Sequence, residues 1–316
     1  MDSEAFVQLA LDNLSCSQKE LAARVGVSPT QISKWKKGEH MSLEMQMKFR
    51  EIAKIGDSDP NFVVWAGSIV EAEKWERLIH FLAQLAQESA ETGYNTSPLM
   101  EDEGSLCWKT FYVLREMGIY IPKKFPEDLD VDYEDPDIED IGVLIEANPY
   151  SALIYEIYNS LNDVYGFYAA YVSELILDEE LNLLDTSACN IEPSLMSLAA
   201  CKLECEQEFA PDFKKFRHRV TNEFEEWLTI VKDKAFRAGV PLKAELLDLV
   251  HQSADELGHE AEAESLGMNS SRIHPDVYMN ELLVGMRVIH QVLPAIMKKL
   301  GIDEEFKLNE KELRIG

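Results

Sequence analysis

The chain of 316 residues is 46% hydrophobic and carries a formal net charge of −28. Its length allows a sizeable buried core and predicts two or more domains. The negative charge excludes a protein that meets nucleic acid over most of its surface. Because no run of about 18 apolar residues occurs and the start lacks the positive flank of a signal peptide, we expect a soluble, cytoplasmic protein. Five cysteines without framework spacing fit a reducing compartment.

The amino-terminal segment predicts a helix followed by a helix-turn-helix. Residues 4–14 place four apolar side chains on one face of a helix: Phe6, Leu9, Ala10 and Leu14. Within residues 17–35, five apolar side chains are spaced so that two short helices crossing at a steep angle bury them together: Leu21, Val25, Val27, Ile32 and Trp35. Ala22 is expected where these helices come closest. Gly26 falls at the bend, where a positive φ favours glycine.

The second helix of this pair has its own start and stop signals. Ser28 is expected to cap it through the hydroxyl, and Pro29 to occupy the first helical position, where no backbone donor is needed. The helix then spans residues 29–37, and Gly38 ends it. Five side chains that the core does not need are hydrogen-bond donors: Thr30, Gln31, Ser33, Lys34 and Lys37.

This segment resembles the Cro/C1-type helix-turn-helix of the XRE family of transcriptional regulators, over roughly residues 3–56. The alternative for the same pattern is an ordinary helical hairpin. The resemblance implies that the helix 29–37 enters the major groove of double-stranded DNA, with Gln18 holding a phosphate. The side chains implied to face base edges are Ser28, Thr30, Ser33 and Lys34. Relatives often have an adenine-reading glutamine where this chain has Pro29, which offers only apolar contact, for example to a thymine methyl.

We therefore assign DNA binding to seven residues: Gln18, Ser28, Thr30, Gln31, Ser33, Lys34 and Lys37. The charge distribution fits this assignment. Residues 1–56 carry eight Lys or Arg and seven Asp or Glu, a net charge of +1. Since the whole chain carries −28, the residues after position 56 carry a net charge of −29. Only this first domain can face phosphates comfortably. Repulsion from the rest should make the affinity modest and strongly dependent on salt.

The next region, residues 57–121, is predicted to be a helical dimerisation or connecting region. It follows a helix over residues 42–55, with Leu43, Met47 and Ile52 apolar and Lys48 and Arg50 outward. Turn-forming residues 56–60 mark the domain boundary. A long helical pattern then spans residues 61–91. Its stripe of Trp75, Leu78 and Leu82 fits either contact between two chains or an internal core helix. Another helix is expected near residues 106–117.

Residues 122–140 contain nine acidic side chains and three prolines. Such a segment is typical of a solvated linker or a long surface loop. A sharper hypothesis makes it a DNA mimic that folds back on Lys34, Lys36 and Lys37. Its aspartates lack the glycine and the closing glutamate of an EF-hand loop, so calcium is not indicated.

Residues 141–316 are predicted to form an α-helical regulatory or interaction domain, which makes the whole chain all-α. Residues 148–177 are rich in tyrosine, which indicates a core helix or, alternatively, the wall of a ligand pocket. In residues 211–239 an amphipathic stripe recurs at helical steps: Phe213, Phe216, Val220, Phe224, Trp227, Val231 and Ala235. Further helices are expected over residues 242–266 and 275–300, the latter kinked at Pro294.

Chemistry is weakly indicated. His251, Asp255 and His259 lie at four-residue steps, and a metal site there is the alternative to a solvated stripe. Cys201 and Cys205 are spaced one helical turn apart, which permits a metal site or a redox switch but also fits core packing. We expect no metal, no cofactor and no catalysis, since no phosphate loop or nucleophile motif is found.

The sequence thus predicts a DNA-binding transcriptional regulator of the repressor type. Its acidic helical region would form a homodimer and sense a small-molecule effector or a protein partner. The competing hypothesis is an antitoxin-like or defence-associated interaction protein, in which the acidic domain binds a basic protein partner and DNA binding serves autoregulation.

Overall fold

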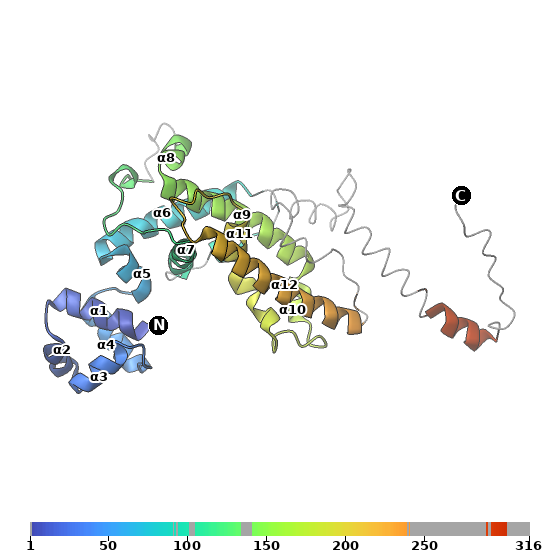
Figure 1. Cartoon of the computed structure of the whole chain (residues 1–316), viewed down its shortest axis with the longest axis horizontal. Coiled ribbons are helices and arrows are strands. Elements are labelled where there is room, and N and C mark those ends of the chain that lie inside the picture. The colour runs from blue at the N-terminus through green and yellow to red at the C-terminus, as the bar shows by residue number, and fades with distance from the viewer. Residues whose placement is uncertain are drawn as a thin grey trace.

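The structure, a computed structural model, describes residues 2–90, 92, 94–100, 105–133, 141–238, 240, 289 and 292–301. Every regular element within these ranges is a helix, so the all-α class is confirmed. Figure 1 shows a small amino-terminal head, residues 2–55, attached to a larger helical body, residues 69–238. None of the helices described is long and apolar enough to cross a membrane.

Four helices build the head: α1 (Asp2–Leu14), α2 (Gln18–Val25), α3 (Pro29–Trp35) and α4 (Leu43–Ala53). Their core is aromatic at its centre. The Phe49 ring lies edge-on to Trp35 at a centroid distance of 5.8 Å and tilted against Phe6 at 6.5 Å. The Trp35 indole N–H donates to the carbonyl of His40 at 3.1 Å, so its one polar atom is paired. Helix α3 is thus anchored by its last residue.

Helix α4 buries a different face from the one expected. Phe49 and Ala53 enter the core, whereas Leu43 and Met47 are 73% and 59% exposed. The Phe49 ring is buried in the core. It removes a large apolar area from water there, which lowers the free energy of the folded chain. Arg50 is consequently not outward, since its guanidinium lies 5.4 Å over the Phe6 ring.

Two basic side chains of α4 donate hydrogen bonds to backbone carbonyls. One bonds within the head, and the other bonds to the turn that follows it. Arg50 donates to the carbonyls of Gly56 and Ser58, both at 2.9 Å, and so fixes the turn that leaves the head. The Lys48 Nζ donates to the carbonyl of Val25 at 2.8 Å, at the end of α2. These two cations therefore serve the fold.

The single long helix expected over residues 61–91 is wrong, because the chain forms α5 (Pro60–Ala66) and α6 (Ile69–Glu88). Gly67 separates them with φ +102°, and a Cβ there would lie 2.7 Å from the backbone oxygen of Lys123. Ser68 then caps α6 by accepting from the backbone N–H of Glu71. The Lys123 Nζ donates to the carbonyl of Val64 at 2.7 Å, so a distant loop fixes this break.

Helix α5 connects the two parts of the molecule. It packs against α1 of the head and against both α6 and α7 (Ser105–Glu116) of the body. Figure 1 shows α5 at the junction between head and body. Asp59 starts the helix by accepting from the backbone N–H of Phe62 at 3.0 Å.

The stripe on α6 belongs to the internal core. Trp75, Leu78 and Leu82 are 0%, 1% and 0% exposed, so a second chain has no access to them. The Trp75 ring is surrounded edge-on by Phe111 and Phe125, with centroids 5.3 and 4.9 Å away. The core interpretation of this stripe is therefore confirmed, and the inter-chain one is wrong.

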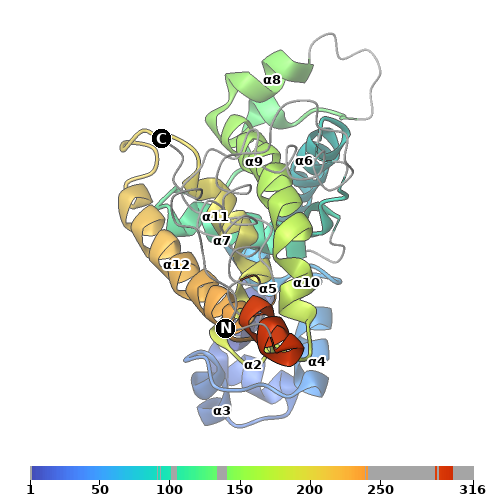
Figure 2. The same cartoon turned by 90° about the vertical axis from the view of Figure 1, so that its right-hand side faces the viewer.

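The body is organised around α9 (Pro149–Tyr171), with α8 (Ile141–Ala147) before it and α10 (Ser173–Leu177) after it. Figure 2 shows α9 between α6 on one side and α11 (Leu195–Cys201) with α12 (Phe213–Ala238) on the other. The remaining described elements are short 3-10 turns at Ser97–Leu99, Glu127–Leu129, Ser187–Asn190 and Glu192–Ser194, and a helical stretch over residues 292–300. Most of the amphipathic stripe on α12 is buried, but Trp227 lies at its edge and Leu228 takes its place.

Tyr158, Tyr168 and Tyr171 of α9 are buried in the core, and the hydroxyls of Tyr158 and Tyr168 have protein partners. The hydroxyls of Tyr158 and Thr110 are 2.6 Å apart inside the core. Tyr168 donates to the Glu192 carboxylate at 2.9 Å. Burial raises the pKa of Tyr158 well above its usual range, so this hydroxyl stays neutral. These contacts favour the core interpretation of the aromatic helix.

The described part of the acidic segment contacts the body. Asp130 forms ion pairs with Lys74 and, at 3.6 Å, with Arg77 on α6. Asp128 accepts from the Asn148 side chain at 2.8 Å, at the start of α9. Asp128 and Asp130 therefore contact the body, and neither covers a lysine of the head. Several predictions fall largely or wholly outside the described residues: the second half of the acidic segment, the helices over 242–266 and 275–300, and the triple His251, Asp255 and His259.

Candidate nucleic-acid interface

The first helix of the pair begins with a reciprocal cap. The Ser17 hydroxyl accepts from the backbone N–H of Glu20 at 3.3 Å, and the Glu20 carboxylate accepts from the Ser17 N–H at 2.8 Å. This hydrogen bonding lowers the pKa of Glu20. Our reading of the sequence missed this capping box, although serine followed three residues later by glutamate is its usual signal. Gly26 then ends α2 with φ +79°, as expected.

Helix α3 begins as predicted and ends earlier. The Ser28 hydroxyl accepts from the backbone N–H of Gln31 at 3.2 Å, with Pro29 at the first helical position. Because capping uses an acceptor lone pair, the hydroxyl proton of Ser28 stays available for donation. The helix ends at Trp35, so Lys37 lies in the following turn, which closes at Gly38 with φ +84°.

The seven predicted interface residues all lie on or beside the helix-turn-helix surface. Those that are exposed are Ser28, Thr30, Lys34 and Lys37, and those that are half-buried are Gln18, Gln31 and Ser33. Ile32 and Trp35 take the opposite face of α3 into the core. Figures 1 and 2 both show α3 at the end of the head that is remote from the body. No described part of the chain covers this surface.

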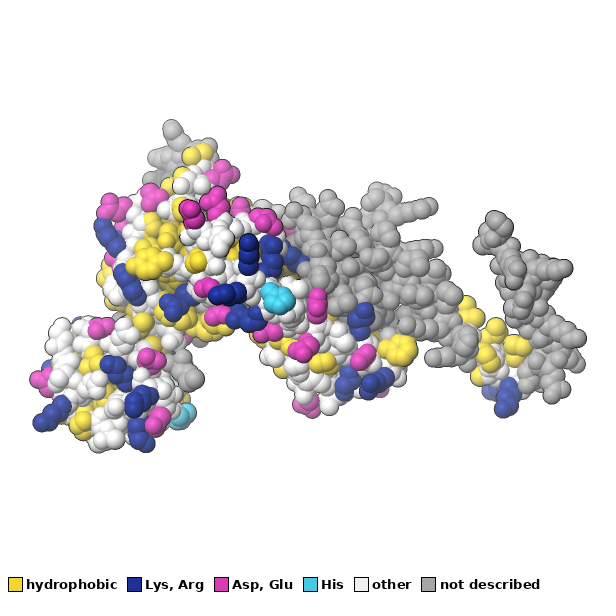
Figure 3. Space-filling model, in the orientation of Figure 1, with side chains coloured by type: hydrophobic (Ala, Val, Ile, Leu, Met, Phe, Trp, Pro, Cys, Tyr) yellow, Lys and Arg dark blue, Asp and Glu magenta, His cyan; other side chains and the backbone are white. Residues whose placement is uncertain are grey.

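Charge around α3 is mostly basic and accessible. Figure 3 shows Lys and Arg side chains spread over the visible face of the head, interspersed with acidic ones. Lys19, Arg24, Lys36 and Lys37 are exposed. Lys34 forms an ion pair with Glu39 at 3.4 Å, and both side chains are about half exposed. The pair is weak in water, so Lys34 can exchange Glu39 for another anion.

The paired cysteines do not lie on one helix as their spacing suggested. Helix α11 ends at Cys201, so Cys205 lies beyond it and the two thiols do not share a helix. Burial raises the pKa of Cys201 to about 12 and that of Cys205 to about 11. Both thiols are therefore neutral near pH 7. A cysteine that acts as a redox switch reacts as the thiolate and needs a lowered pKa.

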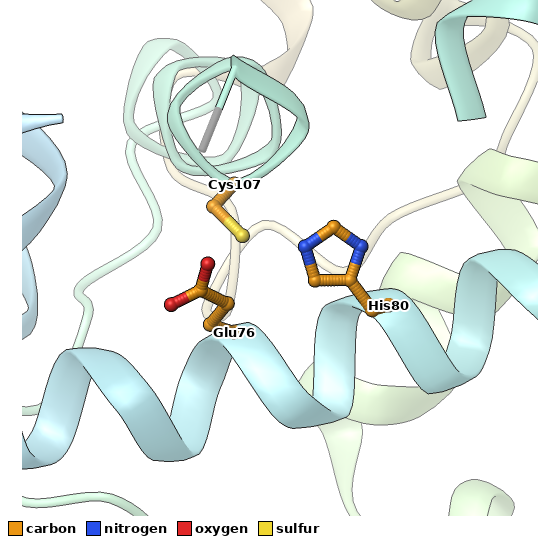
Figure 4. Close-up of side chains that lie close together, drawn as sticks. All are labelled: Glu76, His80 and Cys107. Atoms are coloured by element: carbon orange, nitrogen blue, oxygen red, sulfur yellow. The ribbon is translucent and has the colours of Figure 1, made fainter. Parts of the chain in front are cut away.

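A second cluster joins α6 to α7. Glu76, His80 and Cys107 place one carboxylate oxygen, one ring nitrogen and the sulfur within 4.8 Å of one another. Figure 4 shows Glu76 and His80 on α6 pointing toward Cys107 on α7. Burial, together with the charge of Glu76, raises the pKa of Cys107. Sequence reasoning missed this cluster, since only the four-residue step from Glu76 to His80 is visible in one helix.

Comparison with known proteins bears on the head alone. No curated protein and no solved structure matches the chain. Residues 7–45 match the family described as Helix-turn-helix. This span contains α2, α3 and the turn between them, together with most of α1 and the start of α4. The amino-terminal region of this chain is therefore a helix-turn-helix domain of the Cro/C1 type, found in DNA-binding regulators of the XRE family.

Proposed function

We propose that this protein is a sequence-specific transcriptional regulator, of the repressor type, that reads the DNA major groove with α3. The observation that carries the proposal is the uncovered polar face of α3 at the end of the head remote from the acidic body. A net +1 over residues 1–56 against −29 over the rest supports the same orientation, since only the head meets phosphates without strong repulsion.

The roles follow from position. Gln18 starts α2 and would donate to a phosphate together with the exposed N-terminal turn of that helix. The residues proposed to meet base edges are Ser28, Thr30, Ser33 and Lys34. Gln31 and Lys37 flank this set on the helix and in the following turn, where contacts to the sugar-phosphate backbone fit best.

We propose further that two copies act together on one duplex. The buried α6 stripe is not the contact, but Leu43 and Met47 on α4 offer an exposed apolar pair one helical turn apart in the head. A two-fold dimer requires inverted half-sites separated by one or more helical turns, about 34 Å per turn. A footprint that is single, asymmetric and independent of protein concentration would argue for a monomer.

The test is selection of bound fragments from a random duplex library, with the full chain and at two salt concentrations. The double variant Thr30→Ala/Lys34→Ala should lose the selected sequence. Lys214→Ala is the matched control, because this exposed lysine lies on α12 of the body. A salt slope lower by about 0.9 in the double variant would show that Lys34 contacts a phosphate and not a base edge. An unselective library, or equal loss in the control variant, would refute the proposal.

The second candidate is an interaction protein whose acidic body binds a basic protein partner. The −29 net charge beyond residue 56 favours it. The same double variant separates the two functions, since Thr30 and Lys34 are remote from the body. A partner-binding protein keeps its partner in fixed stoichiometry when both side chains are removed, whereas operator binding is lost. In both candidate functions, a small molecule or a protein would bind the body as an effector.

A further inference from the structure

The cluster of Glu76, His80 and Cys107 combines three different ligand types from two helices. Glu76 and His80 are four residues apart on α6, so both side chains leave the same face of the helix. Cys107, fully buried, lies in the first turn of α7 and points at that face. The three ligand atoms all lie within 4.8 Å of one another. A carboxylate, an imidazole and a thiol thus converge on one point.

The two α6 members are unusual for that helix. Glu71 accepts from the backbone of Phe125 at 2.6 Å, and Lys74 is paired with Asp130. By contrast, neither Glu76 nor His80 makes a hydrogen bond or an ion pair with another side chain or backbone group in the described ranges. Both side chains are at least partly accessible, so no contact from the described part of the protein competes with a ligand placed between them and the sulfur.

The dimensions fit a small ion. Tetrahedral Zn²⁺ has bonds of about 2.0 to 2.3 Å to nitrogen, oxygen and sulfur, which place its ligand atoms roughly 3.5 Å apart. The observed ligand atoms lie within 4.8 Å of one another, so the side chains would have to draw together to bind the ion. The ligand set also selects the metal, since thiolate and imidazole suit zinc-like transition ions, whereas Mg²⁺ and Ca²⁺ take oxygen ligands.

Two of the three ligands face a groove, whereas Cys107 lies buried behind them. Glu76 and His80 line a groove of about 960 Å³ on the surface of the body. Its other charged lining residues are Glu73, Arg77, Glu88 and Asp132, so carboxylates predominate and attract cations. Since the protein offers three ligands, a fourth position remains on the groove side for water or a small anion.

We propose that Glu76, His80 and Cys107 bind one divalent transition-metal ion of the zinc type. The bound ion ties α6 to α7, the two body helices against which α5 packs. The site is independent of the DNA-binding role proposed for the head, because none of its ligands belongs to residues 2–55.

The experiment uses the full chain, reduced and stripped of metal with a chelator, and Co²⁺ as the probe. We expect one Co²⁺ per chain, with a thiolate-to-cobalt charge-transfer band in the near ultraviolet and strong visible bands of tetrahedral cobalt. Zn²⁺ should displace the cobalt and raise the unfolding temperature. Cys107→Ser should abolish the near-ultraviolet band. His80→Ala and Glu76→Gln should each raise the Kd at least tenfold, about the least that loss of a supporting residue costs.

Two variants serve as matched controls. Cys205→Ser removes a half-buried thiol outside the cluster, and His40→Ala removes an exposed imidazole in the head. Both should keep the spectrum and the Kd. If Cys107→Ser does not fold, His80→Ala decides, because its side chain is partly exposed. The proposal is overturned if stoichiometric Co²⁺ gives no thiolate band, if the band survives in folded Cys107→Ser, or if His80→Ala binds as tightly as the unaltered chain.

Discussion

We expect the ion pair between Lys34 and Glu39 to weaken DNA binding by an amount that can be measured. Their charged atoms are 3.4 Å apart, and the two side chains are 50% and 52% exposed. A pair this exposed is worth about 0 to 1 kcal/mol. If Lys34 must leave Glu39 to reach DNA, Glu39→Gln should lower the Kd by up to about fivefold, since 1.4 kcal/mol corresponds to tenfold.

The assay is fluorescence anisotropy with the selected duplex, over a range of salt concentrations, for four proteins. These are the unaltered chain, Glu39→Gln, Lys34→Gln and the double variant. Part of the gain in Glu39→Gln comes from removing repulsion with phosphate, and that part is equal in both backgrounds. The remainder requires Lys34. An equal gain with and without Lys34 would show that the ion pair with Glu39 does not restrain this lysine.

Three further substitutions test the framework around the site, each by urea unfolding of the full chain followed by circular dichroism. Ser28→Ala removes the cap of α3 and should cost about 1 kcal/mol; an unchanged midpoint would mean that the cap contributes nothing. Gly67→Ala should destabilise clearly more than Gly26→Ala, because both need a positive φ but only Gly67 faces a backbone oxygen, that of Lys123, at 2.7 Å; equal losses would contradict the close approach. Tyr158→Phe should cost about 1 kcal/mol, as it deletes one buried hydrogen bond of 2.6 Å; a stabilised variant would argue against that contact.

The helix-turn-helix was predictable because its determinants are local. The cap at Ser28, the bend at Gly26 and the spacing from Leu21 to Trp35 all lie within one segment of fifteen residues. Each signal agrees with the others, which is the condition under which sequence patterns are reliable. The end of α3 was less predictable, because helix ends shift by one or two residues without changing the core.

The errors arose where distant segments decide the outcome. The break at Gly67 lies inside a continuous apolar pattern, and it is fixed by Lys123, more than 50 residues away in the chain. On α4, two apolar faces compete, and only the shape of the space between α1 and α3 selects Phe49 over Met47. Periodicity alone cannot choose between two such faces.

The two candidate sites differ in the same respect: one is formed by a local segment and the other by distant segments. The seven residues of the helix-turn-helix surface lie in one short segment, so the sequence alone identifies them together. The cluster of Glu76, His80 and Cys107 requires the packing of α6 on α7, which no local pattern records. A glutamate and a histidine at a four-residue step are common on helices and become informative only when a third ligand faces them.

Helix α5 has only seven residues, yet it touches α1, α6 and α7. A change in the separation of α6 and α7 would therefore meet the first helix of the head through this one short helix. In a two-fold assembly, a small tilt there would be magnified at the far tip of each head and would alter the distance between the paired recognition helices. Operator spacing would then be the quantity on which any signal received by the acidic portion acts.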